Sequence, residues 1–314
     1  MPRTVVVAIG GNSLITDARH QTVPDQYHAV EQTCDHLTAV LRDKDIRLVI
    51  THGNGPQVGF ILQRSEIASS TLHQVPLDSC VADTQGALGY QLQRALHNAF
   101  RKAGIRRQAV AVVTQVLVDA NDPAFRRPSK PIGSFLTQEK AEEHRQKDGW
   151  EVVEDAGRGW RRVVSSPKPV DILEVEAVRT LLDAGFVVIA AGGGGIAVVD
   201  EGGGQLGGAA AVVDKDLASS LLARRLAADL LVVSTAVERV CLDYGKPTQR
   251  ALETMTVAEA RRYATEGHFQ PGSMLPKVEA LVSFLEGGGK EGLITDPAHL
   301  AAALEGRAGT RVLP

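Results

Sequence analysis

The sequence TVVVAIGGNSL at residues 4–14 runs from an apolar, β-branched segment directly into two glycines and an asparagine. An uninterrupted apolar run of this length is typical of a strand that is buried on both faces of a sheet. The glycines that follow allow a tight turn and let backbone N–H groups approach a ligand closely. This stretch therefore predicts a buried strand that ends in a loop suited to binding an anion.

Similar apolar runs recur along the chain, and segments with helical patterns separate them. Continuous apolar strands that alternate with helices predict an α/β fold whose parallel sheet is covered on both faces. Right-handed crossovers then place the carboxyl ends of the strands on one edge of the sheet, where a ligand binds. We expect strands at Val5–Ile9, Leu48–Thr51, Val110–Thr114, Val187–Ala190, Leu230–Ser234 and Gly292–Thr295, and crossover helices such as Gln26–Asp43 and Leu217–Ala227.

Composition excludes several classes of protein. The 314 residues include 34 Lys and Arg, 37 Asp and Glu, 31 Gly and 3 Cys, with a net charge of −3. This balance lacks the basic excess of a general nucleic-acid binder. No apolar run reaches the ~18–20 residues that span a bilayer, and no signal-peptide pattern precedes the first strand. Three widely spaced cysteines indicate neither a disulfide framework nor a zinc site, so we expect a cytoplasmic protein.

Residues 119–168 interrupt the alternation of strands and helices. This segment carries both tryptophans, Trp150 and Trp160, together with several prolines and many charges of both signs. We expect a small subdomain that protrudes from the main sheet. Lys130 lies inside it, which favours a functional role over a plain surface excursion.

Glycine clusters follow several of the predicted strands. Any one of them is equally typical of a tight turn, but several at strand ends favour a phosphate site, because backbone N–H groups and helix N-termini attract anions. The clusters are Gly10-Gly11-Asn12-Ser13, His52-Gly53-Asn54-Gly55-Pro56, Gly192–Gly195, and Gly202–Gly208, which leads to Asp214-Lys215-Asp216.

The established phosphate motifs do not fit these clusters. The P-loop pattern G-x-x-x-x-G-K-[ST] is absent from the sequence. The letters G-x-G-x-x-G occur at Gly202, Gly204 and Gly207, but an apolar, strand-like run follows them instead of a helix. This is a weak dinucleotide signal, since the fingerprint requires a strand before it and a helix after it.

Three lysines lie in loops whose neighbours restrict them. Lys130 is flanked by prolines, Lys215 lies between two aspartates, and Lys277 follows Pro276. A single loop lysine is usually solvated. Three in rigid settings favour phosphoryl transfer, whose loose transition state is stabilised mainly by positioning and by neutralisation of charge.

Taken together, the motifs resemble those of the carbamate kinases of the amino acid kinase superfamily, in the same order and over nearly the whole chain. The matching segments are AIGGNSL (8–14), THGNGPQVG (51–59), TQGALGYQLQ (84–93), TQVLVDANDPAF (114–125), RPSKPIGSF (127–135), GWRRVVSSPKP (159–169), VIAAGGGGIAVV (188–199), VVDKDLASSLLA (212–223) and GHFQPGSMLPKVEA (267–280).

The resemblance implies a fold and an assembly. It implies an open, mainly parallel sheet of about eight strands between helix layers, with 119–168 as the protruding subdomain and a homodimer as the assembly. Residues 1–314 would form one domain, with an N-terminal lobe at 1–195 for carbamoyl phosphate and a nucleotide-binding lobe at 196–314.

The resemblance also implies roles for individual residues. Lys130, Lys215 and Lys277 would neutralise the phosphates, with Lys130 replacing a lysine that many relatives carry in the first loop, and Asp216 would organise the lysines. The phosphoryl group and the carbamate would lie on Gly10, Gly11, Asn12, Gly53, Asn54 and Gly55, with Asn12 as a side-chain donor. The nucleotide would lie near Gly194, Asp214, Lys215, Thr235, Ala236, Val237, Tyr244, Met274 and Lys277.

The implied activity is reversible phosphoryl transfer between carbamoyl phosphate and ADP, which gives ATP and carbamate. Mg²⁺ would bridge the nucleotide phosphates without a dedicated protein cage. The alternatives are a related kinase for acetylglutamate or glutamate, a non-catalytic nucleotide-binding relative, and a dinucleotide-dependent oxidoreductase. The direction of the reaction stays open, as does its pathway, arginine fermentation or purine and allantoin breakdown. Ser134, Ala197 and Ala236 depart from residues common in the family, and we expect effects on loop rigidity and nucleotide preference.

Overall fold

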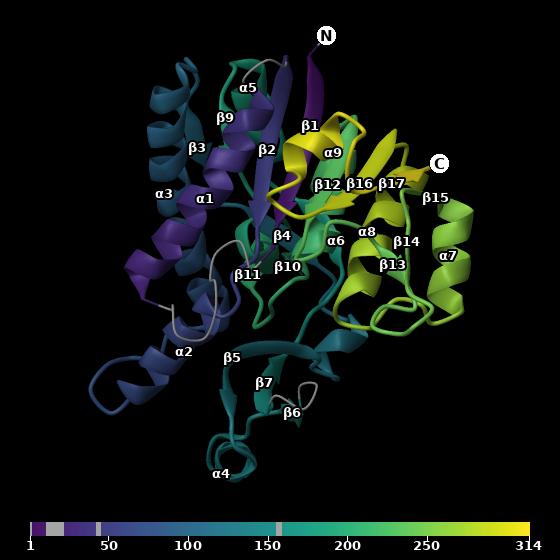
Figure 1. Cartoon of the computed structure of the whole chain (residues 1–314). Helices are drawn as coiled ribbons and strands as arrows, with labels where there is room; N and C mark the ends of the chain where they lie inside the picture. Colours follow the sequence, from purple (N-terminus) through teal and green to yellow (C-terminus); the bar gives the residue numbers. More distant parts are fainter. Residues whose placement is uncertain (1, 11–21, 42–44, 155–158) are drawn as a thin grey trace.

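A mainly parallel sheet of eight strands forms the centre of the computed structural model, which describes residues 2–10, 22–41, 45–154 and 159–314 (Figure 1). The strand order is β15-β17-β16-β12-β1-β2-β9-β3, and β16 and β17 are the antiparallel neighbours. This confirms the predicted α/β class and strand number. The strands are β1 (Arg3–Ile9), β2 (Ile46–His52), β3 (Ala109–Ala111), β9 (Val187–Ile189), β12 (Leu230–Ser234), β15 (Thr254–Thr256), β16 (Glu291–Thr295) and β17 (Thr310–Leu313).

Helices cover both faces of this sheet. Alternate residues of its strands point to opposite faces, so apolar side chains on both faces need cover. Val5 and Val7 of β1 are fully buried on one face and Val6 is fully buried on the other. α1 (Val23–Leu41), α3 (Leu77–Ala103) and α9 (Leu300–Leu304) pack on the first face. The second face is covered by α5 (Val175–Asp183), α6 (Lys215–Arg225), α7 (Val257–Thr265) and α8 (Met274–Glu286). No helix within the described ranges is long and apolar enough to cross a membrane.

Several boundaries differ from those expected. β3 ends at Ala111 instead of Thr114, because the side chain of Gln85 bonds both the backbone N–H and the C=O of Thr114. α6 begins at Lys215 instead of Leu217, because the Asp214 side chain caps the helix. β15 and β17 were not expected. Both are short, and β17 joins the sheet antiparallel to β16.

A small sheet with its own helix protrudes from the main body (Figure 1). It contains the antiparallel strands β5 (Lys130–Leu136), β6 (Val152–Glu154) and β7 (Trp160–Val164), with α4 (Gln138–Asp148) and η2 (Pro123–Phe125) in the same stretch of chain. This sheet contacts α2 (Gln57–Ile67) where Gly59 meets Gly133. A Cβ on Gly59 would lie 2.1 Å from the Gly133 Cα, so the two backbones touch.

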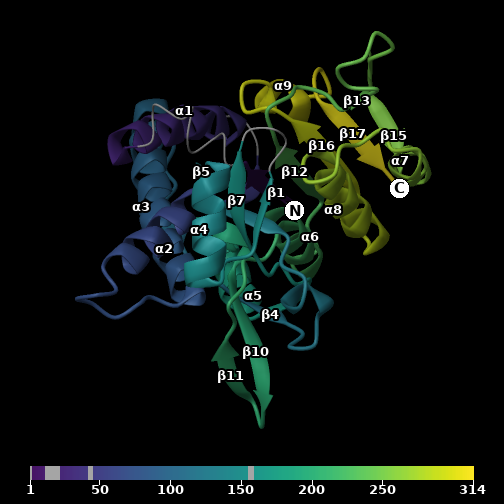
Figure 2. The same ribbon diagram turned by 90° about the horizontal axis from the view of Figure 1, so that it is seen from below.

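A second, four-stranded sheet has the order β11-β10-β4-β8 and was not predicted. Its strands are β4 (Gln115–Val118), β8 (Pro169–Ile172), β10 (Ile196–Gly202) and β11 (Gln205–Gly208), and a smaller pair joins β13 (Cys241–Leu242) to β14 (Arg250–Ala251). β10 and β11 form an exposed hairpin that protrudes from the molecule (Figure 2). Gly202, Gly203 and Gly204 adopt positive φ at its tip. The expectation that Gly202–Gly208 is a phosphate loop is therefore wrong, because these glycines form the tip and one strand of a hairpin and no helix follows them directly.

Candidate active site

The strands β1, β2, β9 and β12 end at one edge of the main sheet, because parallel strands end on the same side. Gly10 follows β1, and the backbone N–H of Gly53 donates to the C=O of Ile9 at 3.3 Å. η3 (Gly192–Gly194) follows β9. The backbone N–H groups of Asn54 and Gly55 have no acceptor among the residues that the structure describes. They are therefore available to an anion.

A cavity of about 210 Å³ lies beside these loops and gathers eight of the site residues that the sequence predicts. Its walls come from the β2–α2 loop, from β5, from the start of α6 and from the start of α8. Of the predicted site residues, it is lined by Gly53, Asn54, Gly55, Lys130, Asp214, Lys215, Asp216 and Lys277.

The three lysines reach this cavity from three separate segments and meet two aspartates. Lys130 Nζ lies 2.6 Å from Asp214 Oδ2. Lys277 Nζ lies 3.0 Å from Asp216 Oδ2, and Lys215 Nζ lies 3.0 Å from Asp216 Oδ1. With three ammonium groups and two carboxylates, the cluster carries one net positive charge. Such a cluster can neutralise a bound phosphate.

Asp214 is held by the helix that follows it. Its Oδ1 accepts hydrogen bonds from the backbone N–H groups of Asp216 at 2.9 Å and Leu217 at 3.4 Å, as an N-cap residue does. Its other carboxylate oxygen is left for Lys130. One side chain therefore begins α6 and fixes the ammonium group of Lys130.

The charged side chains of the cluster shift one another's pKa values. Burial raises the pKa of Asp216, but Lys215 and Lys277 outweigh burial and hold this pKa well below its ordinary value. Burial likewise raises the pKa of Asp214, and Lys130 opposes it, so that this carboxyl also titrates below its ordinary value. Both aspartates are therefore ionised at neutral pH.

Lys215 carries a buried ammonium group with unused donors. Burial lowers the pKa of Lys215, and the charge of Asp216 partly offsets the change. The contact with Asp216 is an ion pair without hydrogen-bond alignment, and Lys215 Nζ has no hydrogen-bond acceptor in the described part of the chain. A buried donor without an acceptor is costly, so this position favours a phosphate oxygen as the missing partner.

His52 is buried against the glycine turn. Its Nδ1 lies 2.9 Å from the Gly53 C=O, and a Cβ on Gly192 would lie 2.4 Å from its Nε2. Burial lowers the pKa of His52 to about 4, and the charge of Lys215 acts in the same direction. The imidazole is therefore neutral at pH 7 and packs as part of the loop.

The other predicted site residues that the structure describes lie outside the lining of this cavity. Gly10 is at the end of β1, Gly194 is in η3, and Thr235, Ala236 and Val237 follow β12. Met274 begins α8 one turn before Lys277, and Tyr244 follows β13 with 65% of its surface exposed. Gly11 and Asn12 lie outside the described residues. The roles of all these residues remain predictions.

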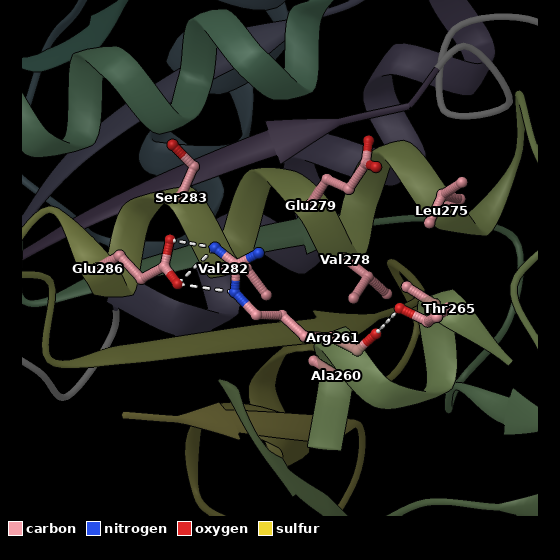
Figure 3. Close-up of a pocket in the computed structure, with 10 residues that line it drawn as sticks. Ala260, Arg261, Thr265, Leu275, Val278, Glu279, Val282, Ser283 and Glu286 are labelled. Carbon is pink, nitrogen blue, oxygen red and sulfur yellow. Dashed lines mark hydrogen bonds and ion pairs between the residues drawn. The ribbon is translucent and has the colours of Figure 1, made fainter. Parts of the chain in front are cut away.

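A second cavity, of about 430 Å³, lies between α7 and α8 and contains none of the predicted site residues. Arg261 of α7 reaches across it to both carboxylate oxygens of Glu286 on α8, at 2.6 and 2.7 Å (Figure 3). Apolar side chains such as Val278 and Leu275 line it beside these charges. The contact joins α8 to its neighbour and so supports the helix whose first turn carries Lys277.

Some lining residues were not singled out as site residues by the sequence. Ile132, Gly193, Gly272 and Ser273 line the cavity with the lysines. Gly193 and Gly272 adopt φ of +68° and +72°, a conformation that favours glycine. Gly193 belongs to the Gly192–Gly195 cluster named above, and Gly272 precedes the predicted Lys277 by five residues, whereas Ile132 carries no such signal.

Comparisons with known proteins identify the family of this chain. The model of the amino acid kinase family matches residues 3–296. The carbamate kinase-like protein YahI of Escherichia coli is 51% identical, with 100% of this chain and 99% of that protein covered. The carbamate kinase of Clostridium perfringens is 46% identical, with 98% and 99% covered. The structure of Giardia lamblia carbamate kinase bound to AMP-PNP superposes with a TM-score of 0.91 at 38% identity, covering 99% of this chain and 98% of that one.

Proposed function

The chain belongs to the amino acid kinase family, and we propose that it catalyses the carbamate kinase reaction, reversible phosphoryl transfer between carbamoyl phosphate and ADP. One observation carries the proposal. Three lysines from β5, α6 and α8 meet in one cavity with two aspartates, beside the backbone N–H groups of Asn54 and Gly55, which have no acceptor in the described part of the chain. Carbamate kinases that match over their full length support the same activity.

The reaction needs positioning and charge neutralisation more than covalent catalysis by the protein. A terminal oxygen of ADP attacks the phosphorus of carbamoyl phosphate, a P–O bond forms, and the bond to the carbamate oxygen breaks. Carbamate leaves with the electron pair and then decomposes to ammonia and carbon dioxide. Lys130, Lys215 and Lys277 stabilise the charge on the transferring group, while Asp214 and Asp216 hold these lysines in place.

Magnesium is proposed to arrive with the nucleotide. Both carboxylates in the cavity are engaged by lysines, and in the described ranges no group of three or more His, Cys, Asp or Glu side chains could hold a metal ion. A hard ion that retains waters and binds phosphate oxygens fits this donor set. Bound Mg²⁺ would neutralise charge on the nucleotide phosphates. Chelation by EDTA is expected to abolish activity, and excess Mg²⁺ to restore it.

The alternative functions fit less well. A kinase for acetylglutamate or glutamate needs a pocket for an amino-acid carboxylate, typically with an arginine, and no arginine is among the described residues that line the cavity. The full-length relatives likewise favour carbamate kinase. The oxidoreductase interpretation rests on the G-x-G-x-x-G letters alone. It is wrong, because Gly202 and Gly204 lie at the tip of a hairpin.

A coupled assay tests the proposal directly. Purified protein with carbamoyl phosphate and Mg-ADP is expected to form ATP, which hexokinase and glucose-6-phosphate dehydrogenase convert to an NADPH signal. Acetyl phosphate, acetylglutamyl phosphate and glutamyl phosphate serve as competing donors. ATP formation at background rate from millimolar carbamoyl phosphate would refute the proposal, and preference for a larger acyl phosphate would assign the related kinase instead.

We further propose a cytoplasmic homodimer that consumes carbamoyl phosphate from arginine breakdown or from purine and allantoin breakdown. The three cysteines are free thiols, as in proteins of reducing compartments. β3 lies at the edge of the main sheet, and Val113, which follows it, is 60% exposed. An edge strand followed by an exposed apolar side chain favours contact with a second copy. Light scattering is expected to give the dimer mass, and Val113→Lys to shift it toward the monomer.

A further inference from the structure

Two polar side chains of α3 are buried on the side that faces the active site. Thr84 has no exposed surface, and Gln85 is 4% exposed. Burial of a polar group is costly unless the group is hydrogen-bonded, so the partners of these two side chains indicate what they stabilise. Both bond to loops that form the active site, although Gln85 is absent from the cavity lining, as is Thr84.

Thr84 holds the side chain of Asn54. The Thr84 hydroxyl donates to the C=O of Val81 at 2.6 Å, so the lone pairs of Thr84 Oγ1 stay available as acceptors. Asn54 Nδ2 donates to this oxygen at 3.2 Å. On its other side this amide touches the backbone of Gly193, where a Cβ would lie 2.4 Å from Nδ2. Asn54 is itself 5% exposed. Its amide is therefore confined between α3 and the glycine turn.

Gln85 holds the Gly192–Gly195 turn in place in the same way. Its Nε2 donates to the C=O of Gly192 at 2.9 Å and to the C=O of Thr114 at 3.0 Å. Its Oε1 accepts from the backbone N–H of Thr114 at 2.8 Å. Thr114 Oγ1 in turn accepts from the N–H of Ala191, the residue just before the turn. One buried amide thus ties together three segments that are far apart in the sequence.

We propose that Thr84 and Gln85 are positioning residues for phosphoryl transfer. Adjacent on one turn of α3, they join the Gly53–Gly55 loop and the Gly192–Gly195 turn into a single anion-binding surface. This inference rests on the proposed function, because it assigns the surface to carbamoyl phosphate. Preorganised donors are effective only when they cannot rearrange, and a small misplacement costs a large part of the rate.

The test compares Thr84→Val with Thr84→Ser. Valine keeps the shape of threonine and removes the hydroxyl, whereas serine keeps the hydroxyl. Thr84→Val is expected to lower kcat/KM for carbamoyl phosphate by roughly 10- to 100-fold and to leave the KM for ADP unchanged. Thr84→Ser is expected to retain the wild-type values. Gln85→Met, which removes both amide donors at similar length, is expected to behave like Thr84→Val.

Hydrogen exchange gives a readout that does not depend on the reaction. Amides of a peptide covering residues 52–58 are expected to exchange faster in Thr84→Val than in Thr84→Ser or the wild type. Equal kinetics in Thr84→Val and the wild type, or equal losses in the valine and serine variants, would overturn the inference. If the wild type made no ATP, the proposed function would fail, and unchanged exchange in Thr84→Val would then still refute the positioning role.

Discussion

Lys130 lies on a strand of the protruding sheet, yet its Nζ is 2.6 Å from Oδ2 of Asp214, the residue that caps α6, 84 positions away in the sequence. The two side chains are each about one quarter exposed, at 28% and 25%. This contact joins the protruding sheet to the lobe that we propose binds the nucleotide. It brings the ammonium group of Lys130 to the same cavity as Lys215 and Lys277.

Removal of a cavity lysine is expected to reduce the rate of the chemical step. Lys130→Ala and Lys277→Ala each remove one fixed charge from the transferring phosphoryl group, and we expect kcat to fall by roughly 10²- to 10³-fold. The measurement is the coupled ATP-forming assay at saturating substrates. Lys147→Ala is the control, because Lys147 is exposed on α4, the helix that accompanies the protruding sheet, and pairs with Glu143. Unchanged kcat in both cavity variants would show that the site lies elsewhere.

Asp216→Asn is expected to lower the free energy of unfolding as well as the rate of the reaction. Asp216 is 4% exposed and is the counter-charge of both Lys215 and Lys277. Breaking a buried pair on one side costs about 3–5 kcal/mol, because the remaining charges stay buried without a partner. Urea unfolding at pH 7 measures the loss. Asp183→Asn, at an exposed pair with Arg47, is expected to cost about 1 kcal/mol or less, and equal losses in the two variants would contradict the assignment.

The lowered pKa of buried His52 predicts how the free energy of unfolding depends on pH. Its pKa is lowered from an ordinary 6.5 to about 4 in the folded protein. Between these values the unfolded chain binds more protons, so the contribution of neutral His52 is complete above the higher value and is lost as the pH falls toward the lower one. We expect a loss of about 2 kcal/mol between pH 7 and pH 5. His52→Asn, which keeps a donor near the Gly53 C=O, is expected to remove this dependence, and identical pH profiles would refute it.

The contact between Gly59 and Gly133 is expected to control the placement of Lys130. A Cβ on Gly59 would overlap the Gly133 backbone, so Gly59→Ala must displace β5, the strand that begins at Lys130. We expect kcat to fall by roughly 10²-fold. Gly86→Ala is the matched control, because Gly86 is an exposed helix position with open space around it. It is expected to keep full activity and gain about 0.5–1 kcal/mol of stability, and full activity of Gly59→Ala would show that the contact is dispensable.

Local sequence patterns determined the class of the fold and marked the lysines and one glycine loop of the candidate site. Apolar runs identified the strands at the centre of the sheet, since burial on both faces requires apolar side chains at successive positions. Glycine before a polar residue marked the Gly53–Gly55 loop, and restricted loop positions marked Lys130, Lys215 and Lys277. These signals are local, because they depend on backbone freedom and on side-chain solvation at single positions.

Tertiary structure decided what those local signals could not. Gly202–Gly208 has the composition of a ligand loop, yet pairing of β10 with β11 makes it an exposed hairpin. The pairing of Lys130 with Asp214, and of Gln85 with Thr114 and Gly192, depends on which segments pack together. A hydrogen bond or an ion pair forms across space, so residues distant in the sequence acquire partners only when the sheet and its helices bring them together. The sequence thus supplied the chemical groups, and packing chose their partners.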